Sequence, residues 1–259
     1  LAYFAKKFEG EATYIMSRFF PDYILNYIKE VSQNSIKIIK APNLKLGVER
    51  DFYQYLLNLV RTDSKFKNYQ PLWHAKYSGE YSEFLGNDII KNLKFIPDYI
   101  VLVVGAGATL EGQAIPIKLN FKSIPKIVVP EHYESSLLKK RRPNIEIINE
   151  TSNNKKLNTN WFSRPPKGIP HYVIGPHYDE INPLLKTAVI NLIDCVYMYD
   201  ELNWKEMSIK CYEKGLEIGN SSAANLYVSK QLAEKGFKVL TFIYEPFRAF
   251  YHGHNIESV

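Results

Sequence analysis

A glycine-rich stretch in the middle of the chain carries residue types that bind phosphate. Residues 103–112 read Val-Val-Gly-Ala-Gly-Ala-Thr-Leu-Glu-Gly and end an apolar run that predicts a buried strand. Gly105 and Gly107 permit positive φ and close backbone approach, and a helix is expected to begin with Thr109 in its first turn. Free N–H groups at such a turn, with the positive end of the helix dipole, form a cradle for an anion. We therefore expect a phosphate here, with the Thr109 hydroxyl as an additional donor.

The same stretch is open to two other interpretations. A dinucleotide site needs G-x-G-x-x-G and an acidic residue after the next strand. Gly105, Gly107 and Glu131 fit that pattern. However, Leu110 stands where the third glycine belongs, and the helix lies mid-chain rather than first in a nucleotide domain. Glycines at a strand–helix junction also serve tight packing alone. A nicotinamide-dependent oxidoreductase is therefore the alternative enzyme class.

A second turn of small residues lies towards the end of the chain. Residues 218–225 read Ile-Gly-Asn-Ser-Ser-Ala-Ala-Asn and open a strong helical pattern over 221–235. Asn220 and Ser221 are expected to cap this helix at its start and Gly236 at its end. Alternatively, a serine hydroxyl here is a neutral hydrogen-bond partner for the nitrogen of a heteroaromatic ring. Such a partner would leave a pyridine unprotonated, which favours β-elimination and replacement over transamination.

Helical and strand patterns alternate along the segments that must position these turns. In the first part of the chain, helices are expected at 1–8, 21–31 and 48–62, and strands at 12–16 and 35–39. Parallel strands need crossover connections, so the alternation predicts a parallel sheet. The Tyr-, Ser- and Gly-rich stretch 69–86 is interpreted as a passage between domains. We expect a smaller domain at residues 1–76 and a larger one at residues 77–259.

The larger domain is expected to follow the same plan. Strands are expected at 97–104, 125–130 and 237–244, and helices at 87–93, 184–194, 200–215 and 221–235. The polar, proline-containing stretch 139–168 is interpreted as an insertion. The expected fold class is α/β with mostly parallel sheets.

Composition argues against several classes of protein. The chain has 259 residues, of which 46% are hydrophobic and 23% charged, as in ordinary globular domains. No apolar run is long enough to span a membrane. The basic cluster at 139–142 is interpreted as a solvated surface loop, because a nucleic-acid site would need aromatic residues interleaved with the charges. We expect neither a membrane nor a nucleic acid as partner.

Cysteines and histidines show no spacing typical of a metal site. Cys195 and Cys211 lie in stretches interpreted as helical, and we expect both to be reduced core residues of a cytoplasmic protein. His252 and His254 are the one close histidine pair and lie near the end of the sequence. We therefore expect no metal.

Six short motifs occur here in the same order as in one known family of enzymes. Residues 1–16 are similar to a helix and the strand "A-T-I-V-M-P", residues 36–42 to "AEVVLTP", and residues 103–112 to the phosphate loop "G-x-G-T-G-G-T-L-x-G". Residues 126–138 resemble "KVVGVEPxxSxxL", residues 174–183 "GIGYDFIP" and residues 219–224 "GISSGAA". The chain thus resembles the cysteine synthase/cystathionine β-synthase family, which uses pyridoxal 5'-phosphate (PLP). The resemblance implies fold type II, with two three-layer α/β/α domains and a PLP cofactor.

The resemblance also assigns roles to single residues. Five residues would hold the PLP phosphate, namely Gly105, Ala106, Gly107, Ala108 and Thr109. Ser221 would face the pyridine nitrogen, and Gly175 and Tyr178 would border the substrate.

The chain departs from the family pattern in several places. Alanines stand at 106, 108 and 223 where the family has Thr or Gly, and residues 245–251 replace its "P-D-x-G-x-R-Y" end. Residues 1–8 read as the interior of a helix without an N-cap, so we expect an upstream segment before Leu1. The family's Schiff-base lysine belongs to that segment, and no lysine of this chain is nominated as catalytic.

The predicted function is PLP-dependent β-replacement on a serine derivative. The donor would be O-acetylserine or O-phosphoserine, the acceptor sulfide or a thiol, and the product cysteine or a related amino acid. Arg141, Arg142 or Arg164 is a candidate for binding the phosphate of O-phosphoserine. The resemblance implies a homodimer. A non-catalytic relative that acts as a binding or regulatory subunit is a further alternative.

Overall fold

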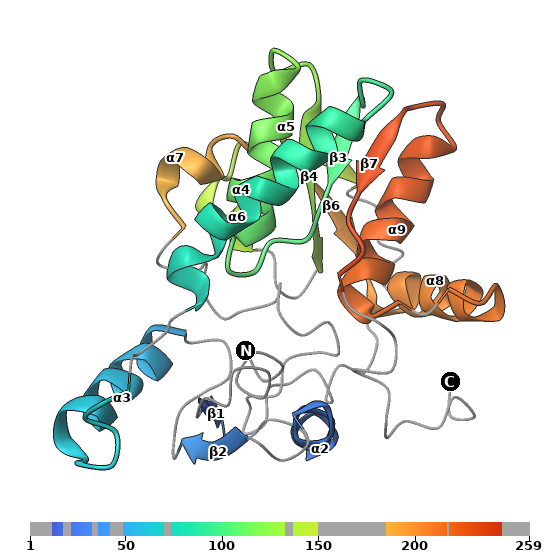
Figure 1. Ribbon diagram of the computed structural model, residues 1–259. Coiled ribbons are helices and arrows are strands. Elements are labelled where there is room, and N and C mark those ends of the chain that lie inside the picture. The colour runs from blue at the N-terminus through green and yellow to red at the C-terminus, as the bar shows by residue number, and fades with distance from the viewer. Residues whose placement is uncertain are drawn as a thin grey trace.

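Two separate parallel sheets form the frame of the part of the chain that the structure describes. The computed structural model describes residues 12–17, 22–32, 36–41, 49–69, 74–132, 137–149, 185–216 and 218–244. In the smaller sheet, β1 (Ala12–Ser17) pairs with β2 (Ile36–Ala41) (Figure 1). Helix α2 (Asp22–Val31) lies between these strands in sequence, and α3 (Glu49–Thr62) follows them. The predicted alternation of helix and strand is confirmed for these elements.

The larger sheet has five strands in the order β5-β6-β4-β3-β7, and each neighbouring pair is parallel. Its strands are β3 (Tyr99–Val101), β4 (Lys126–His132), β5 (Glu146–Asn149), β6 (Cys195–Tyr199) and β7 (Val239–Thr241). Its helices are α4 (His74–Asn92), α5 (Ile115–Asn120), α6 (Leu137–Arg141), α7 (Thr187–Ile190), α8 (Glu201–Glu213) and α9 (Asn220–Ala233), with a π-helical turn, η1 (Leu110–Ala114), before α5. The predicted α/β class with parallel sheets is confirmed.

Apolar side chains of β3 and the residues after it alternate between the two faces of this sheet, as strand geometry requires. Ile100 and Leu102 belong to a core cluster that also contains residues of η1 and α5. Val101 and Val103 point to the other face and lie in clusters with residues of α9. Figure 1 shows α4 and α5 on one side of the sheet and α9 on the other. Both faces are therefore covered, which explains the almost continuous apolar run in the sequence.

The order of the strands creates a switch point beside β3. From β3 the chain passes through η1 and α5, on one face, to β4 on one side of β3. From β6 it passes through α8 and α9 to β7 on the other side of β3, and α9 covers the opposite face. In open α/β sheets, ligands bind outside the carboxyl ends of the strands at such a point. The carboxyl end of β3 is therefore the expected position of a ligand site.

Most of residues 69–86, interpreted from the sequence as a passage between domains, is helical, so the helix expected at 87–93 begins earlier than predicted. Helix α4 (His74–Asn92) spans 19 residues and crosses η1. Gly79 and Gly86 do not end the helix; they allow close contact, because a Cβ added to Gly86 would lie 2.3 Å from the Gly112 carbonyl oxygen. The division of the chain at residue 76 stays a prediction. Within the residues described, no helix combines the length and apolar character needed to cross a bilayer.

Residues 184–194 were expected to form a helix, and the structure contradicts most of this expectation. Only α7 (Thr187–Ile190) is helical, and the next element is the fully buried strand β6 (Cys195–Tyr199). Cys195 therefore lies in a central strand and not in a helical stretch. The expected insertion at 139–168 also contributes to the sheet, because residues 146–149 form the edge strand β5.

The two cysteines should differ sharply in reactivity. Cys195 is fully buried, and burial raises its pKa to about 12, whereas Cys211 is partly exposed, although partial burial raises the pKa of its thiol too. Only the thiolate is a strong nucleophile. We expect Ellman's reagent at pH 8 to modify one thiol in the folded protein and both after denaturation. Rapid modification of a folded Cys211→Ser variant would contradict this assignment.

Candidate functional site

The predicted anion cradle lies at the switch point beside β3. Gly107 has φ +96°, a conformation that side chains disfavour, and its ideal Cβ would lie 2.4 Å from Leu185 Cδ1. Helical backbone starts at the next residue, and the Glu111 N–H donates to the Gly107 carbonyl oxygen at 2.8 Å. Ala108, Thr109 and Leu110 lie in the first turn, where a helix offers no upstream carbonyls to its N–H groups. A strand, a glycine turn and a helix start thus follow one another as the sequence predicted.

Thr109 stands in the first turn of this helical run. Its backbone is helical, with φ −67° and ψ −35°, and its side chain makes no capping hydrogen bond. Thr109 is partly exposed, as are Gly105, Ala106 and Ala108, whereas Gly107 is buried. The hydroxyl is therefore placed at the start of the helix, where it can meet an anion held by the backbone.

The π-helical turn η1 follows directly on the cradle. Its i→i+5 bond runs from the Ile115 N–H to the Leu110 carbonyl oxygen. The Glu111 side chain lies against α4, since a Cβ added to Gly79 would be 2.6 Å from Glu111 Oε2. Burial raises the pKa of Glu111, and the nearby Lys186 opposes this shift. Close packing of η1 on α4 therefore holds the helix that begins at the cradle.

The serine-containing turn lies at the start of α9, but its serines are not the cap. Gly219 is the N-cap residue, with an extended backbone and no side-chain capping bond, so the prediction of Asn220 and Ser221 as caps is wrong. Ser222 is fully buried, and its Oγ accepts a hydrogen bond from the Tyr244 N–H at 2.9 Å. Ser221 is 8% exposed. Of the two serines, Ser221 is thus the one nearer to solvent.

One side chain connects the two turns. Asn225 of α9 is fully buried, and its Oδ1 accepts a hydrogen bond from the Val103 N–H at 2.7 Å. Val103 also lies in one core cluster with Ala223 and Ala224. The start of α9 therefore packs against the chain that leads from β3 into the cradle.

Asn225 was not among the predicted site residues, although the sequence contains a signal for it. Positions 225, 228 and 232 share one face of the α9 helix, because residues three and four apart lie on the same side. Val228 and Leu232 are buried on that face. A lone asparagine in an apolar stripe indicates a buried polar group with specific partners.

Three of the residues that the sequence predicts for the site have no described position. Gly175, Tyr178 and Arg164 lie outside the described residues. In the part of the chain that is described, no group of three His, Cys, Asp or Glu side chains is arranged to hold a metal ion.

The acidic residue of the dinucleotide interpretation has another role. Glu131 is buried, and its Oε1 accepts a hydrogen bond from the Leu138 N–H at 2.8 Å. Its Oε2 accepts from the Lys139 N–H at 3.4 Å. The carboxylate thus binds the start of α6, and this engagement weighs against its use as a ribose ligand.

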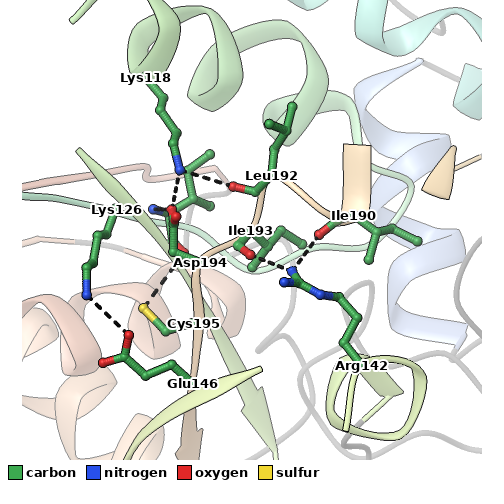
Figure 2. Close-up of polar contacts among 10 residues, drawn as sticks. Lys118, Lys126, Arg142, Glu146, Ile190, Leu192, Ile193, Asp194 and Cys195 are labelled. Atoms are coloured by element: carbon green, nitrogen blue, oxygen red, sulfur yellow. Dashed lines mark hydrogen bonds and ion pairs between the residues drawn. The ribbon is translucent and has the colours of Figure 1, made fainter. Parts of the chain in front are cut away.

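The structure contradicts the assignment of Arg142 to a substrate phosphate. Figure 2 shows its Nη1 donating to the carbonyl oxygens of Ile190, at 3.0 Å, and Ile193, at 2.5 Å. Ile193 lies just before β6, at the amino end of the strand, whereas the cradle follows the carboxyl end of β3. Among the described residues, Arg141 Nη2 donates to the Thr187 hydroxyl, at 3.4 Å. Arg142 therefore supports the sheet at the end opposite to the cradle.

A partly buried ion pair holds the same amino end of the sheet. Lys118 Nζ lies 2.5 Å from Asp194 Oδ2, which also accepts the Ile127 N–H at 2.6 Å (Figure 2). A second pair joins Lys126 to Glu146 at 3.2 Å and is exposed. These charges connect α5, β4 and the start of β6. They are structural and lie away from the candidate site.

Comparisons with known proteins place this geometry in a familiar architecture. No family model matches the sequence, and no curated protein matches it. Similar solved structures include a hydrogen sulfide-producing enzyme in complex with an α-aminoacrylate intermediate, with a TM-score of 0.65 and 20% identity over 96% of this chain and 67% of that chain. An O-acetylserine dependent cystathionine beta-synthase from Helicobacter pylori has a TM-score of 0.64 and 18% identity over 99% of this chain and 73% of that chain.

An O-ureido-L-serine synthase has a TM-score of 0.64 and 14% identity over 100% of this chain and 75% of that chain. At sequence identities this low, the structural likeness shows a common fold, and it does so over nearly the whole chain. The chain therefore has the α/β fold, with parallel sheets, of a sulfide-producing enzyme, a cystathionine beta-synthase and an O-ureido-L-serine synthase.

Proposed function

We propose that the protein binds PLP and replaces the β-substituent of a serine derivative with sulfide or another thiol. The observation that carries the proposal is the hydrogen bond from Val103 to Asn225, because it brings the glycine cradle and the serine turn to one end of the sheet. According to their names, one enzyme with this fold depends on O-acetylserine, one synthesises O-ureido-L-serine and one produces hydrogen sulfide. This chemistry supports the same class of substrate here.

The cradle fits the phosphate of PLP. A phosphate needs several N–H donors and a backbone without side chains in its way. Gly107 meets the second condition, since it has no side chain and its φ of +96° disfavours one. Residues 105–109 would supply the N–H groups, and the Thr109 hydroxyl would add one donor.

Ser221 would bind the ring nitrogen, while Ser222 would not. Ser222 is fully buried, and its hydroxyl holds the segment after β7 by accepting the Tyr244 N–H, whereas Ser221 is the more exposed of the two serines. A neutral serine hydroxyl does not protonate a pyridine, so Ser221 would favour β-replacement over transamination. When bound, PLP would withdraw electrons from the α-carbon of the amino acid and so ease departure of the β-substituent.

The substrate would bind beside the same end of the sheet. We place Gly175 and Tyr178 at the substrate by their resemblance to the "GIGYDFIP" motif. The donor would be O-acetylserine or O-phosphoserine, and the product cysteine or a related amino acid. A homodimer in the cytoplasm is part of the same proposal.

Titration of the full-length protein with PLP tests the proposal. We expect PLP to bind with a visible circular dichroism band, and O-acetylserine with sulfide to yield cysteine. Ser221→Asp should protonate the ring nitrogen, shift the visible spectrum and lower the turnover number by about a hundredfold. Ser208→Ala is the control, because Ser208 Oγ on α8 is buried and has no hydrogen-bond partner among the described residues.

Three outcomes separate the proposal from its rivals. Absence of PLP binding by the wild type would contradict the cofactor assignment. Binding without turnover on O-acetylserine or O-phosphoserine would favour a non-catalytic relative. Equal spectra of the wild type and Ser221→Asp would show that Ser221 does not face the ring nitrogen.

A further inference from the structure

The carboxamide of Asn225 lies where two neighbouring strands separate. Strands β3 and β7 pair in register up to Val101 and Thr241. Beyond this point, Asn225 Oδ1 accepts the Val103 N–H at 2.7 Å, and Asn225 Nδ2 donates to the Phe242 carbonyl oxygen at 3.0 Å. The side chain therefore replaces the ladder bonds that the two diverging strands no longer make with each other.

Only one orientation of this amide satisfies both contacts. An N–H must meet an oxygen and a carbonyl must meet an N–H, so the two partners determine which amide atom faces which strand. Asn225 is fully buried, so neither backbone group would gain water if the amide were lost. Both hydrogen bonds span distant parts of the sequence, since Val103 is 122 residues from Asn225 and Phe242 is 17 residues away.

Two more side-chain hydrogen bonds lie beside Asn225 and join the start of α9, β3 and β7. Ser222, one turn before Asn225, accepts the Tyr244 N–H at 2.9 Å. The Thr241 hydroxyl donates to the Val101 carbonyl oxygen at 2.9 Å, at the last paired position of β3 and β7. The start of α9, the exit of β3 and the exit of β7 are thus joined by side-chain hydrogen bonds.

We infer that Asn225 is a positioning residue, which sets the distance between the phosphate cradle and Ser221. This inference rests on the proposed function, because PLP would be held at both ends by these two turns. Val103 lies two residues before Gly105, and Asn225 lies four residues after Ser221. A shift of the amide would therefore move the phosphate donors relative to the partner of the ring nitrogen.

Two variants of Asn225 remove its carboxamide in different ways. A third variant, elsewhere on α9, controls for a general loss of stability. Asn225→Asp keeps an acceptor for the Val103 N–H but cannot, as a carboxylate, donate to Phe242. Asn225→Leu has a similar size and makes neither bond. Leu232→Val is the control, because Leu232 is a buried residue of the same helix that lies two turns farther along and makes no contact with the cradle.

We expect both Asn225 variants to bind PLP about tenfold more weakly than the wild type, and to lose amplitude in the visible circular dichroism band. We also expect faster hydrogen exchange at the Val103 amide and across residues 105–109. The Leu232→Val variant should unfold at a lower temperature and keep the wild-type affinity and exchange at these amides.

The inference would be overturned if both Asn225 variants bound PLP as tightly as the wild type. It would also be overturned if Leu232→Val lost as much PLP affinity as the Asn225 variants. Failure of the wild type to bind PLP would instead overturn the proposed function. In that case the exchange experiment still decides the role of Asn225: unchanged exchange at Val103 and residues 105–109 would refute it, and a selective increase would support it.

Discussion

The Gly112→Ala variant is expected to lose about 2–3 kcal/mol of unfolding free energy, because η1 and α4 touch without space for a methyl group. A Cβ added to Gly112 would lie 2.3 Å from Ser82 Cβ and 2.5 Å from the Gly79 carbonyl oxygen. Backbone atoms cannot move aside as a flexible side chain can. Denaturation by urea, followed by far-UV circular dichroism, measures the loss.

Two further variants test whether the contact itself causes the loss. Gly86 faces Gly112, so Gly86→Ala should be costly as well, and the double variant should cost less than the sum. Gly215→Ala is the control, because Gly215 has φ +76° and nothing within 4 Å of an added Cβ. It should cost only about 1 kcal/mol, from backbone strain. A Gly112→Ala variant that is as stable as Gly215→Ala would contradict the close contact.

The Gly107→Ala variant should lose most of its affinity for PLP while it still folds. A side chain at φ +96° costs on the order of 1–3 kcal/mol, and the added Cβ would meet Leu185 Cδ1 at 2.4 Å. Relief of this strain would turn the N–H groups of the cradle away from the phosphate. We expect the dissociation constant to rise at least about tenfold, measured by titration of PLP fluorescence.

Gly236→Ala is the matched control for this variant. Gly236 has φ +90°, but nothing lies within 4 Å of its added Cβ, and it stands beyond the far end of α9. Its substitution strains the backbone in a similar way and leaves the cradle alone. If Gly236→Ala weakened PLP binding as much as Gly107→Ala, loss of stability rather than geometry would explain the effect.

Local patterns in the sequence were sufficient for the strand, turn and helix around the cradle. The apolar run before Val103 predicted a buried strand, and the spacing of Gly105 and Gly107 predicted the turn. These predictions depend on neighbours along the chain, since glycine adopts the φ of Gly107 without the strain that a side chain would cause. The strand was predicted too long at its carboxyl end, because the Val103 N–H bonds to Asn225 instead of a neighbouring strand.

Errors arose where contacts between distant residues outweigh local preference. Gly79 and Gly86 weaken a helix locally, yet α4 continues through both because their lack of side chains lets it pack closely on η1. Cys195 begins a strand because β6 inserts between β4 and β5, which no local pattern reveals. Arg142 resembled a phosphate ligand in the sequence but binds carbonyl groups at the amino end of the sheet.

The amino-acid sequence by itself determined the α/β class and the two turns, because periodicity and glycine placement act over a few residues. Only the tertiary structure decided that the two turns meet. Their meeting requires β7 to pair with β3, and it requires one buried amide to bridge residues 122 positions apart. The order of strands in a sheet is a property of the whole chain, since each pairing depends on which faces the crossover helices cover.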